Sequence, residues 1–514
     1  MTALERAIRR PPLVRGFRAT SPLDGLDRRS VGFFDVFAQS VSAVAPAAAA
    51  TTVTLLVAGL SPTATVTSLL LGGVLIILVA RTISQFARRF AAAGAVYTYT
   101  ARGLGVRAGL AAGASAIIGY GAIAMFALLG GAFYSTLVLR SVWPSLPDTP
   151  LVAAGVLSAE AALLVLVLVR GIRLSSRVAL IVEAASVTLI VGLLIALLTR
   201  IGPIDPAVLL PSADDSPLTV AAGALVALTA YVGFESAATL GVEARMPLRT
   251  VPRAIGWTAV VSAALYVLAA VAQVSGFAAI GGDFAASTSP VNDLADAFGL
   301  GGWGVVADLG IAASFLACAI GSTTALSRVL FTMARDGALP AGLGRTHRRF
   351  GTPIGAIACA VPVVIAAPLG LLLSGIALPT AMHLTLVVGG FGYIVSYALV
   401  CVAAPVFLRR IGELTGRVAV VAIACAVALV GTIVAFAIID VGSGSIAVWV
   451  AAALALTAAA AIAWRLRRAP LSALGAYDEP VAGAVLGGAA EHPVDLAPGG
   501  TTPGEAEASR DGAG

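Results

Sequence analysis

The sequence predicts an all-α polytopic membrane protein with about twelve transmembrane helices. Of its 514 residues, 59% are hydrophobic and only 11% are charged, whereas soluble domains carry about 25% charged residues. Apolar stretches long enough to cross a bilayer, about 20 residues each, recur from Val31 to Trp464. Most of the surface therefore faces hydrocarbon rather than water.

Charged residues, Pro and Gly mark the ends of these stretches and divide the chain into predicted spans. The first six are Val31–Gly59, Thr63–Phe86, Arg107–Leu139, Leu151–Val169, Ser176–Leu198 and Leu218–Leu240. The other six are Ile255–Phe277, Gly302–Met333, Ile354–Leu373, Thr380–Phe407, Val418–Ile439 and Ile446–Trp464.

The positions of arginine support this number of spans. All 32 basic residues are Arg, and with twelve spans all of them except Arg140 and Arg200 fall on one side of the membrane. Since basic residues concentrate in cytoplasmic loops, we expect both termini to be cytoplasmic. Heavy use of Ala, Gly and Val is associated with bacterial genomes of high GC content, so the expected location is the bacterial cytoplasmic (inner) membrane.

The two ends of the chain differ in composition from its middle. Residues 1–30 are polar and Arg-rich, too polar for a cleaved signal peptide, and are expected to form a cytoplasmic tail. Residues 31–468 form the predicted transmembrane domain. Residues 469–514 are rich in Pro, Gly, Ala and Glu, which predicts a disordered cytoplasmic tail.

Composition also argues against several classes of function. The net charge of +6 is not gathered on a soluble domain, so nucleic acid is not an expected partner. A membrane-embedded enzyme would need clustered catalytic groups such as HExxH, and the sequence contains none; a channel remains an alternative. No cofactor or metal is expected, because the cysteines lie in apolar segments without metal-ligand spacing and are interpreted as core residues: Cys318, Cys359, Cys401 and Cys425.

Two predicted spans contain residues that interrupt a helix. The first reads FAQSVSAVAPAAAATT from Phe37, and Pro46 removes a backbone hydrogen bond in its interior. The sixth contains Gly233 near its middle. Paired breaks of this kind indicate a transporter site, although a packed proline kink and close helix packing at glycine are alternatives.

Glu235 follows Gly233 at membrane depth. A charge there is costly unless it is paired or hydrated. We favour a structural role for this carboxyl, in which it binds loose backbone donors and holds the interrupted segment in shape.

Three stretches resemble signatures of the amino acid/polyamine/organocation permeases. They are GFESAATLGVEARMPLRTVPRAI from Gly233, FARRFAAAGAVYTYTARGLG from Phe86, and SRVLFTMARDGALP from Ser327. The second departs from the family pattern at Ala92 and Ala95, where relatives carry Pro and Gly. The first span also lacks the Gly-rich GxG of many members.

This resemblance implies a LeuT-like five-plus-five inverted repeat with broken first and sixth helices, and secondary active transport of an amino acid or related amine. Helix N-termini at the breaks would bind the substrate carboxylate, and free carbonyls its ammonium. Tyr231 is either a lid over the substrate or a core aromatic residue. The implied lining residues are Ser40, Val41, Ser42 and Ala43 at the first break, and Thr229, Ala230, Tyr231 and Gly233 at the second.

The coupling ion is expected to be a proton. Some proton-coupled relatives carry a Lys in the fifth helix, where the corresponding residue here is Ser186, and the neighbouring Glu183 is an acid in an apolar run that could carry the proton instead. Glu183 could equally be a structural acid. Sodium coupling stays open because hydroxyls of the eighth helix could bind that ion, and exchange is a further alternative; the hydroxyl residues are Ser322, Thr323 and Thr324.

Overall fold

The computed structural model of the protein describes residues 21–147, 149–170, 172–212, 215–287, 289–442, 444–468, 471 and 474–479. Residues 25–478 form one compact unit, which contains every helix discussed below. The described part of this unit is almost entirely helical, and its β-structure consists of two isolated bridges, Val31 with Ala244 and Ala92 with Tyr477.

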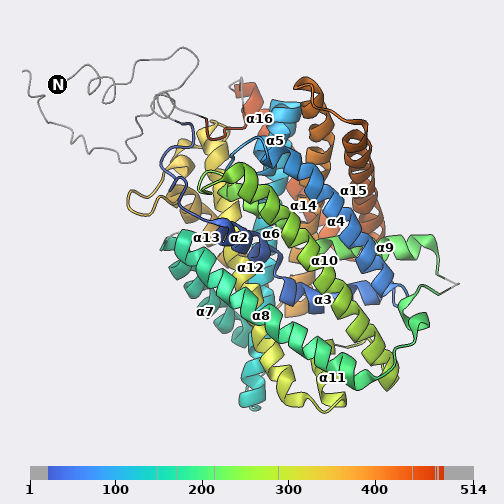
Figure 1. The fold of residues 1–514 in the computed structure, drawn as a ribbon. Coiled ribbons are helices and arrows are strands. Elements are labelled where there is room, and N and C mark those ends of the chain that lie inside the picture. The colour runs from blue at the N-terminus through green and yellow to red at the C-terminus, as the bar shows by residue number, and fades with distance from the viewer. Residues whose placement is uncertain are drawn as a thin grey trace, which may run out of the picture. The chain divides into compact units, whose positions relative to one another are not determined.

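The helices follow one another with short connections (Figure 1). The first half of the unit contains α2 (Phe33–Val44), α3 (Pro46–Leu60), α4 (Thr65–Ala87), α5 (Val96–Leu104), α6 (Val106–Val142), α7 (Pro150–Val169), α8 (Ile172–Ile201), η1 (Pro206–Leu209), α9 (Pro217–Thr229) and η2 (Phe234–Leu240). The second half contains α10 (Pro247–Ile280), α11 (Pro290–Ala297), α12 (Gly301–Arg335), η3 (Ala341–Gly344), α13 (Ile354–Leu373), α14 (Leu378–Arg410), α15 (Gly416–Gly442) and α16 (Ala447–Arg468).

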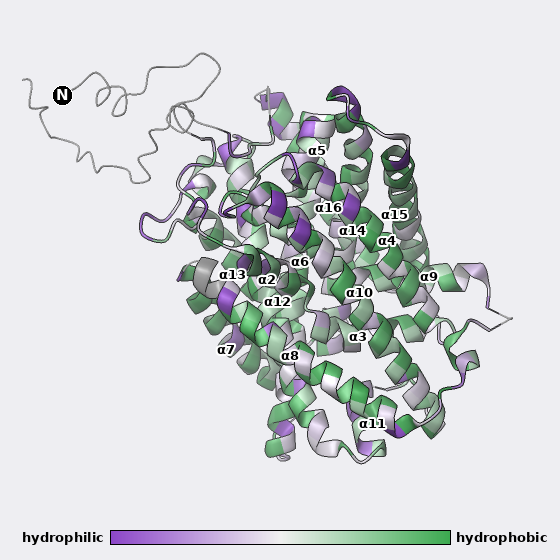
Figure 2. Ribbon diagram, viewed as in Figure 1, coloured by the Kyte–Doolittle hydropathy of each residue, from purple (hydrophilic) through white to green (hydrophobic). Residues whose placement is uncertain are grey.

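Among the described residues, 12 helical segments are long and apolar enough to cross a membrane, which confirms the predicted number of spans. Hydrophobic residues dominate these segments, and hydrophilic residues gather in the loops that join their ends (Figure 2). In the last span, α16, only 11% of the most apolar 18-residue stretch is buried inside the protein, whereas in the first span 83% is buried. The protein is therefore a multi-pass membrane protein, with the first span at its centre and the last at its edge.

Most helices begin or end within a few residues of the predicted spans, and three differences are larger or change the order of the elements. The short helix α5 was not expected, and it is separated from α6 by Gly105, whose positive φ of 89° ends one helix before the next begins. The seventh span, α10, begins at Pro247 rather than Ile255, because Pro fits the first turn of a helix. The third, α6, continues to Val142.

The broken first helix lies among the other helices rather than at the surface. Its first half, α2, contacts α8, α10, α12 and η2, while its second half, α3, contacts α9 and α10. Helix α6 packs along both α12 and α14. These contacts place both interruptions at the centre of the unit, where backbone groups can be satisfied by protein.

Two expectations require correction. The stretch beyond Arg468 is not structureless throughout, because the Asp478 N–H donates to the Ala91 carbonyl at 2.7 Å and Tyr477 pairs with Ala92; residues 480–514 lie outside the described part. Three of the four cysteines are buried as expected, but Cys359 on α13 is exposed.

Candidate functional site

The first helix breaks at Ala45, one residue before Pro46. Ala45 adopts a left-handed conformation with φ of 49°, and its N–H donates back to the Val41 carbonyl at 3.0 Å, which closes α2. Pro46 has no N–H to donate and begins α3. The predicted break is therefore present, and it divides the span into two short helices (Figure 1).

The sixth helix is interrupted after Thr229, where α9 ends. The chain turns at Gly233, with φ of 100°, and continues as the 3₁₀ segment η2. A Cβ at Gly233 would lie 2.8 Å from the Ala43 carbonyl oxygen. Glycine is thus required both by the backbone conformation and by the close approach of the two interrupted helices.

Polar groups tie the two interrupted helices together. The Ser40 hydroxyl donates to the Phe234 carbonyl, and the Ser236 hydroxyl donates to the Gln39 carbonyl at 3.0 Å. The Gln39 amide in turn donates to the Gly321 carbonyl of α12 at 2.8 Å. The backbone at membrane depth is thereby satisfied within the protein, as hydrocarbon requires.

The carboxyl of Glu183 lies at the N-terminus of α3. Its Oε1 atom accepts from the Ala47 N–H at 3.3 Å and from the Ser314 hydroxyl at 2.9 Å. The Ala48 N–H donates to the same hydroxyl at 3.3 Å. A helix N-terminus favours a negative group through its free N–H donors and dipole, and the buried Oε2 atom has no hydrogen-bond partner among the described residues.

Glu235 is held by two tyrosines. The Tyr120 hydroxyl of α6 donates to Oε1 at 2.6 Å, and the Tyr397 hydroxyl of α14 donates to Oε2. The Tyr397 oxygen also accepts from the Gly233 N–H at 3.1 Å. Glu235 is fully buried and so connects three spans at the turn of the sixth helix.

A small cavity lies where the two breaks meet. Its volume of about 20 Å³ holds one water molecule, so a substrate of several heavy atoms requires the surrounding helices to move apart. The lining is apolar apart from two threonines and a thiol, and includes no charged side chain. The lining residues are Ala43, Val44, Ala45, Ala48, Ala49, Thr52, Val53, Ile123, Phe126, Thr229, Ala230, Val232, Phe315, Cys318 and Leu386.

Three of the residues implied by the family resemblance line this cavity: Ala43, Thr229 and Ala230. Tyr231 instead donates its hydroxyl to the Leu69 carbonyl of α4 at 3.3 Å and packs against Tyr266 with ring centroids 4.8 Å apart. Its ring therefore belongs to the packing between α4 and α10.

The remaining candidate residues are not among the residues that line the cavity. The Val41 carbonyl accepts the N–H that closes α2, and the Ser42 hydroxyl donates to the Gln39 carbonyl at 3.2 Å. The Ser186 hydroxyl donates to the Val182 carbonyl within its own helix. On α12, Ser322 contacts Cys318 at 3.8 Å, the Thr323 hydroxyl has no hydrogen-bond partner in the described part of the chain, and Thr324 is buried.

Several lining residues were not singled out from the sequence. Phe126, Phe315 and Leu386 look like ordinary core residues of apolar spans, and no sequence pattern separates them from lipid-facing neighbours. The Cys318 thiol donates to the Ala43 carbonyl at 3.3 Å, a role that its spacing could not indicate. Within the described ranges no group of three or more His, Cys, Asp and Glu residues could hold a metal ion.

Comparison with known proteins identifies relatives of this chain. An uncharacterized transporter of Mycobacterium tuberculosis is 28% identical over 366 residues, which cover 70% of this chain and 77% of the relative. The branched-chain amino acid permease BcaP of Lactococcus lactis is 28% identical over 36% of this chain and 40% of its own. A mitochondrial cationic amino acid transporter of Arabidopsis thaliana is 27% identical over 28% of this chain and 23% of its own.

A solved structure supports the same fold. The structure of MhsT in complex with L-phenylalanine matches with a TM-score of 0.55 at 14% identity, covering 80% of this chain and 99% of MhsT. The LeuT-like architecture with interrupted first and sixth helices is therefore confirmed. The model of the amino acid permease family matches residues 31–460. This chain, a transporter and not an enzyme, belongs to the amino acid permease family.

Proposed function

We propose that the protein is a secondary active transporter that carries a neutral amino acid with an apolar side chain across the cytoplasmic membrane, together with a proton. The observation that carries this proposal is the cavity at the two helix breaks. The cavity has an apolar lining and reaches the N-terminus of α3, where the buried carboxyl of Glu183 accepts a backbone hydrogen bond.

The lining supports an uncharged substrate side chain. Its surfaces come from Val53, Ile123, Phe126, Phe315 and Leu386, and no acid or base lines it. A cationic side chain enclosed there would lose its hydration without gaining a partner. Two similar proteins, a branched-chain amino acid permease and a protein bound to L-phenylalanine, are named with apolar amino acids, and one plant relative is named for cationic ones. The uncharged lining favours the apolar class for this chain.

The position of Glu183 supports proton coupling. The N-terminus of α3 is the natural site for the substrate carboxylate, and Ala48 lines the cavity there. At the same helix end, Glu183 accepts from the Ala47 N–H and the Ser314 hydroxyl. A second carboxylate bound at this helix end would disfavour the ionised form of Glu183. Substrate binding is therefore accompanied by protonation of Glu183, so substrate and proton travel together.

Sodium coupling and exchange are the alternatives. Sodium would need oxygen ligands, and Ser322, Thr323 and Thr324 are the candidate residues of α12. The Cys318 thiol donates to the Ala43 carbonyl, so a sulfur atom rather than a hydroxyl oxygen lies beside that carbonyl. Because sulfur is a poor ligand for sodium, this contact favours proton coupling over sodium coupling.

A binding screen tests the substrate. Purified protein is titrated with leucine, valine, phenylalanine, arginine and putrescine, and binding is followed by calorimetry and thermal shift. We expect the apolar amino acids to bind and to raise the melting temperature. Binding of arginine or putrescine without binding of the apolar amino acids would exclude the proposed substrate class.

Uptake into proteoliposomes tests the coupling. An inward proton gradient should drive accumulation of the bound amino acid without sodium, and Glu183→Gln should bind substrate but lose this drive. Glu160→Gln is the matched control, since Glu160 on α7 is a half-buried carboxyl bonded to Ser135 at 2.9 Å and lies outside the cavity lining. Strict sodium dependence, or normal proton-driven uptake by Glu183→Gln, would refute the coupling.

A further inference from the structure

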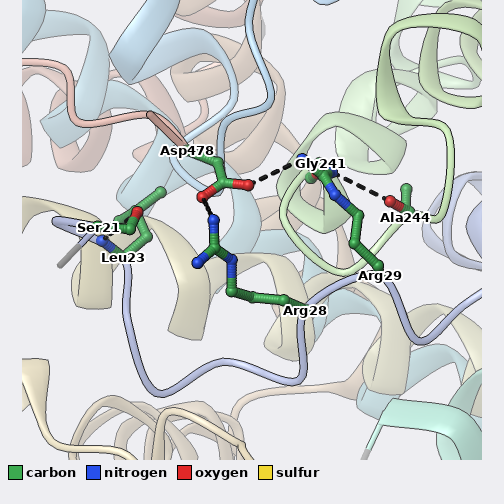
Figure 3. Close-up of polar contacts among 7 residues, drawn as sticks. All are labelled: Ser21, Leu23, Arg28, Arg29, Gly241, Ala244 and Asp478. Atoms are coloured by element: carbon green, nitrogen blue, oxygen red, sulfur yellow. Dashed lines mark hydrogen bonds and ion pairs between the residues drawn. The ribbon is translucent and has the colours of Figure 1, made fainter. Parts of the chain in front are cut away.

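The C-terminal segment Leu474–Asp478 is bound to the transmembrane unit at both of its ends. At one end, the Asp478 carboxylate lies between two arginines that precede α2 (Figure 3). It pairs with Arg28 and, at 2.9 Å, with Arg29. The Asp478 side chain is only 2% exposed, so water screens these ion pairs less than it screens pairs at an open surface.

The other end of the segment is held by α12 and α5. The Gly475 N–H donates to the Asp336 carboxylate, just beyond α12, at 2.7 Å. Arg102 of α5 donates to the Gly475 carbonyl at 3.0 Å and lies over the Tyr477 ring at 4.6 Å. Burial raises the pKa of the Asp336 carboxyl above its ordinary value, against the effect of the groups that donate to it.

The arginine pair also links this segment to the sixth span. Arg29 donates to the Ala244 carbonyl at 3.2 Å and to the Gly241 carbonyl at 3.5 Å, both of which follow η2 (Figure 3). The neighbouring Val31 forms a bridge with Ala244. Asp478 therefore binds where the segment before α2 contacts the segment that follows η2.

We propose that Leu474–Asp478 is a latch that fastens the start of α2 to α5 and the end of α12, and thereby holds the cytoplasmic side of the transporter closed. That this face is cytoplasmic rests on the orientation proposed from the arginine distribution. The contacts made by Leu474–Asp478 do not depend on that orientation. Helix α2 has 12 residues and ends at the left-handed Ala45, so it can pivot there once its beginning is released. Opening the cavity toward this face requires such a movement, and the latch opposes it.

Hydrogen–deuterium exchange of the full-length protein in lipid nanodiscs tests the latch. In Asp478→Ala, backbone amides of residues 29–44 and 241–246 should exchange about tenfold faster, because local opening loses charge-assisted hydrogen bonds. A chain ending at Ala473 should show the same increase. The control is Glu413→Ala, which removes the pair between Glu413 and Arg89 near the ends of α14 and α4, and it should leave these amides unchanged.

Measuring substrate uptake by the same variants distinguishes failure of the latch proposal from failure of the proposed transport function, on which the latch proposal rests. Faster exchange with faster uptake supports both, and faster exchange with no uptake in any variant supports the latch while refuting the transport proposal. Unchanged exchange in both Asp478→Ala and the shortened chain would overturn the latch. So would an increase of equal size in Glu413→Ala, since that would show a general loosening of this face.

Discussion

At the scale of single residues, Gly233 combines two constraints that a side chain would violate. Its φ of 100° suits glycine, and a Cβ would lie 2.8 Å from the Ala43 carbonyl oxygen. We predict that Gly233→Ala weakens substrate binding at least about tenfold, because the strain of about 1–3 kcal/mol displaces Ala43 and the backbone of the second break from the positions that form the site. Calorimetry on the purified variant measures the change.

Gly256→Ala provides the comparison. This glycine lies on α10 without a positive φ, and apart from its chain neighbours and the adjoining backbone of its own helix no atom lies within 4 Å of the position that a methyl group would occupy. The variant should bind substrate as the wild type does. If Gly233→Ala binds substrate with unchanged affinity, the binding site lies away from the helix breaks.

A second residue-scale prediction concerns the two tyrosines that hold Glu235. Tyr397 both donates to Glu235 and accepts from the Gly233 N–H, whereas Tyr120 donates to Glu235 only. Removing a buried partner costs about 1–3 kcal/mol. Tyr397→Phe should therefore lower the melting temperature more than Tyr120→Phe. Equal or reversed shifts in a thermal unfolding assay would contradict this account of the Glu235 site.

At this scale the sequence predicted the charged and conformationally special residues better than the apolar ones. Glu183 stands out because an ionisable side chain is costly at membrane depth, and Pro46 because it removes a helix hydrogen bond. Gly233 stands out because it begins a stretch that resembles a family signature. Phe315 and Cys318 look like ordinary core residues of an apolar span. Their role depends on which helices meet, and one sequence does not show that.

At the scale of elements, a buried ion pair joins α12 to the loop between η2 and α10. Arg328 contacts Glu243 at 2.6 Å, and their side chains are only 4% and 1% exposed. Arg328→Met leaves an unpaired buried carboxylate, which costs about 3–5 kcal/mol. We expect a large fall in the melting temperature, and a substantial recovery when Glu243→Leu is added.

The exposed pair of Arg89 and Glu413 is the contrasting case, because a surface pair contributes at most about 1 kcal/mol. Arg89→Met should change the melting temperature little. If the single Arg328→Met variant were as stable as the wild type, the buried pair would not be holding these elements together.

The approximate position of most spans could be predicted because hydrocarbon thickness and helix rise set a minimum apolar length of about 20 residues. The predicted span Ile354–Leu373 has the same limits as α13. Helix α5 was missed because Val96–Leu104 is short and contains YTYTAR, which has no membrane-spanning pattern. Its ends lie at Ala95 and Gly105, with positive φ values of 44° and 89°, and an alanine gives no sign in the sequence that it will adopt a positive φ.

At the scale of the whole molecule, the arginine distribution predicts which side each loop faces. Single cysteines at the exposed positions Ser212 and Arg348 should react with an impermeant reagent from opposite sides, Ser212 from outside the cell. The exposed Cys359 must first be replaced by Ser. Reaction of both positions from the same side would contradict the proposed topology.

The C-terminal segment marks the limit of sequence-based prediction at this scale. Its Pro, Gly and Ala content indicates disorder, yet five residues, Leu474–Asp478, find specific partners on α5, the start of the first span and the end of α12. Those partners are far apart in the sequence. Only the assembled helices bring them together, so composition alone could not reveal the binding of Asp478.

The break at Ala45 also bears on how the protein is assembled during synthesis. Helices α2 and α3 contain 12 and 15 residues, about 18 and 22 Å of helix, and neither alone crosses a hydrocarbon core of about 30 Å. The groups that satisfy the broken backbone, Glu183, Ser314 and Cys318, emerge from the ribosome much later. We therefore expect the first span to enter the bilayer as one nearly continuous helix and to separate into two only when the eighth span has arrived.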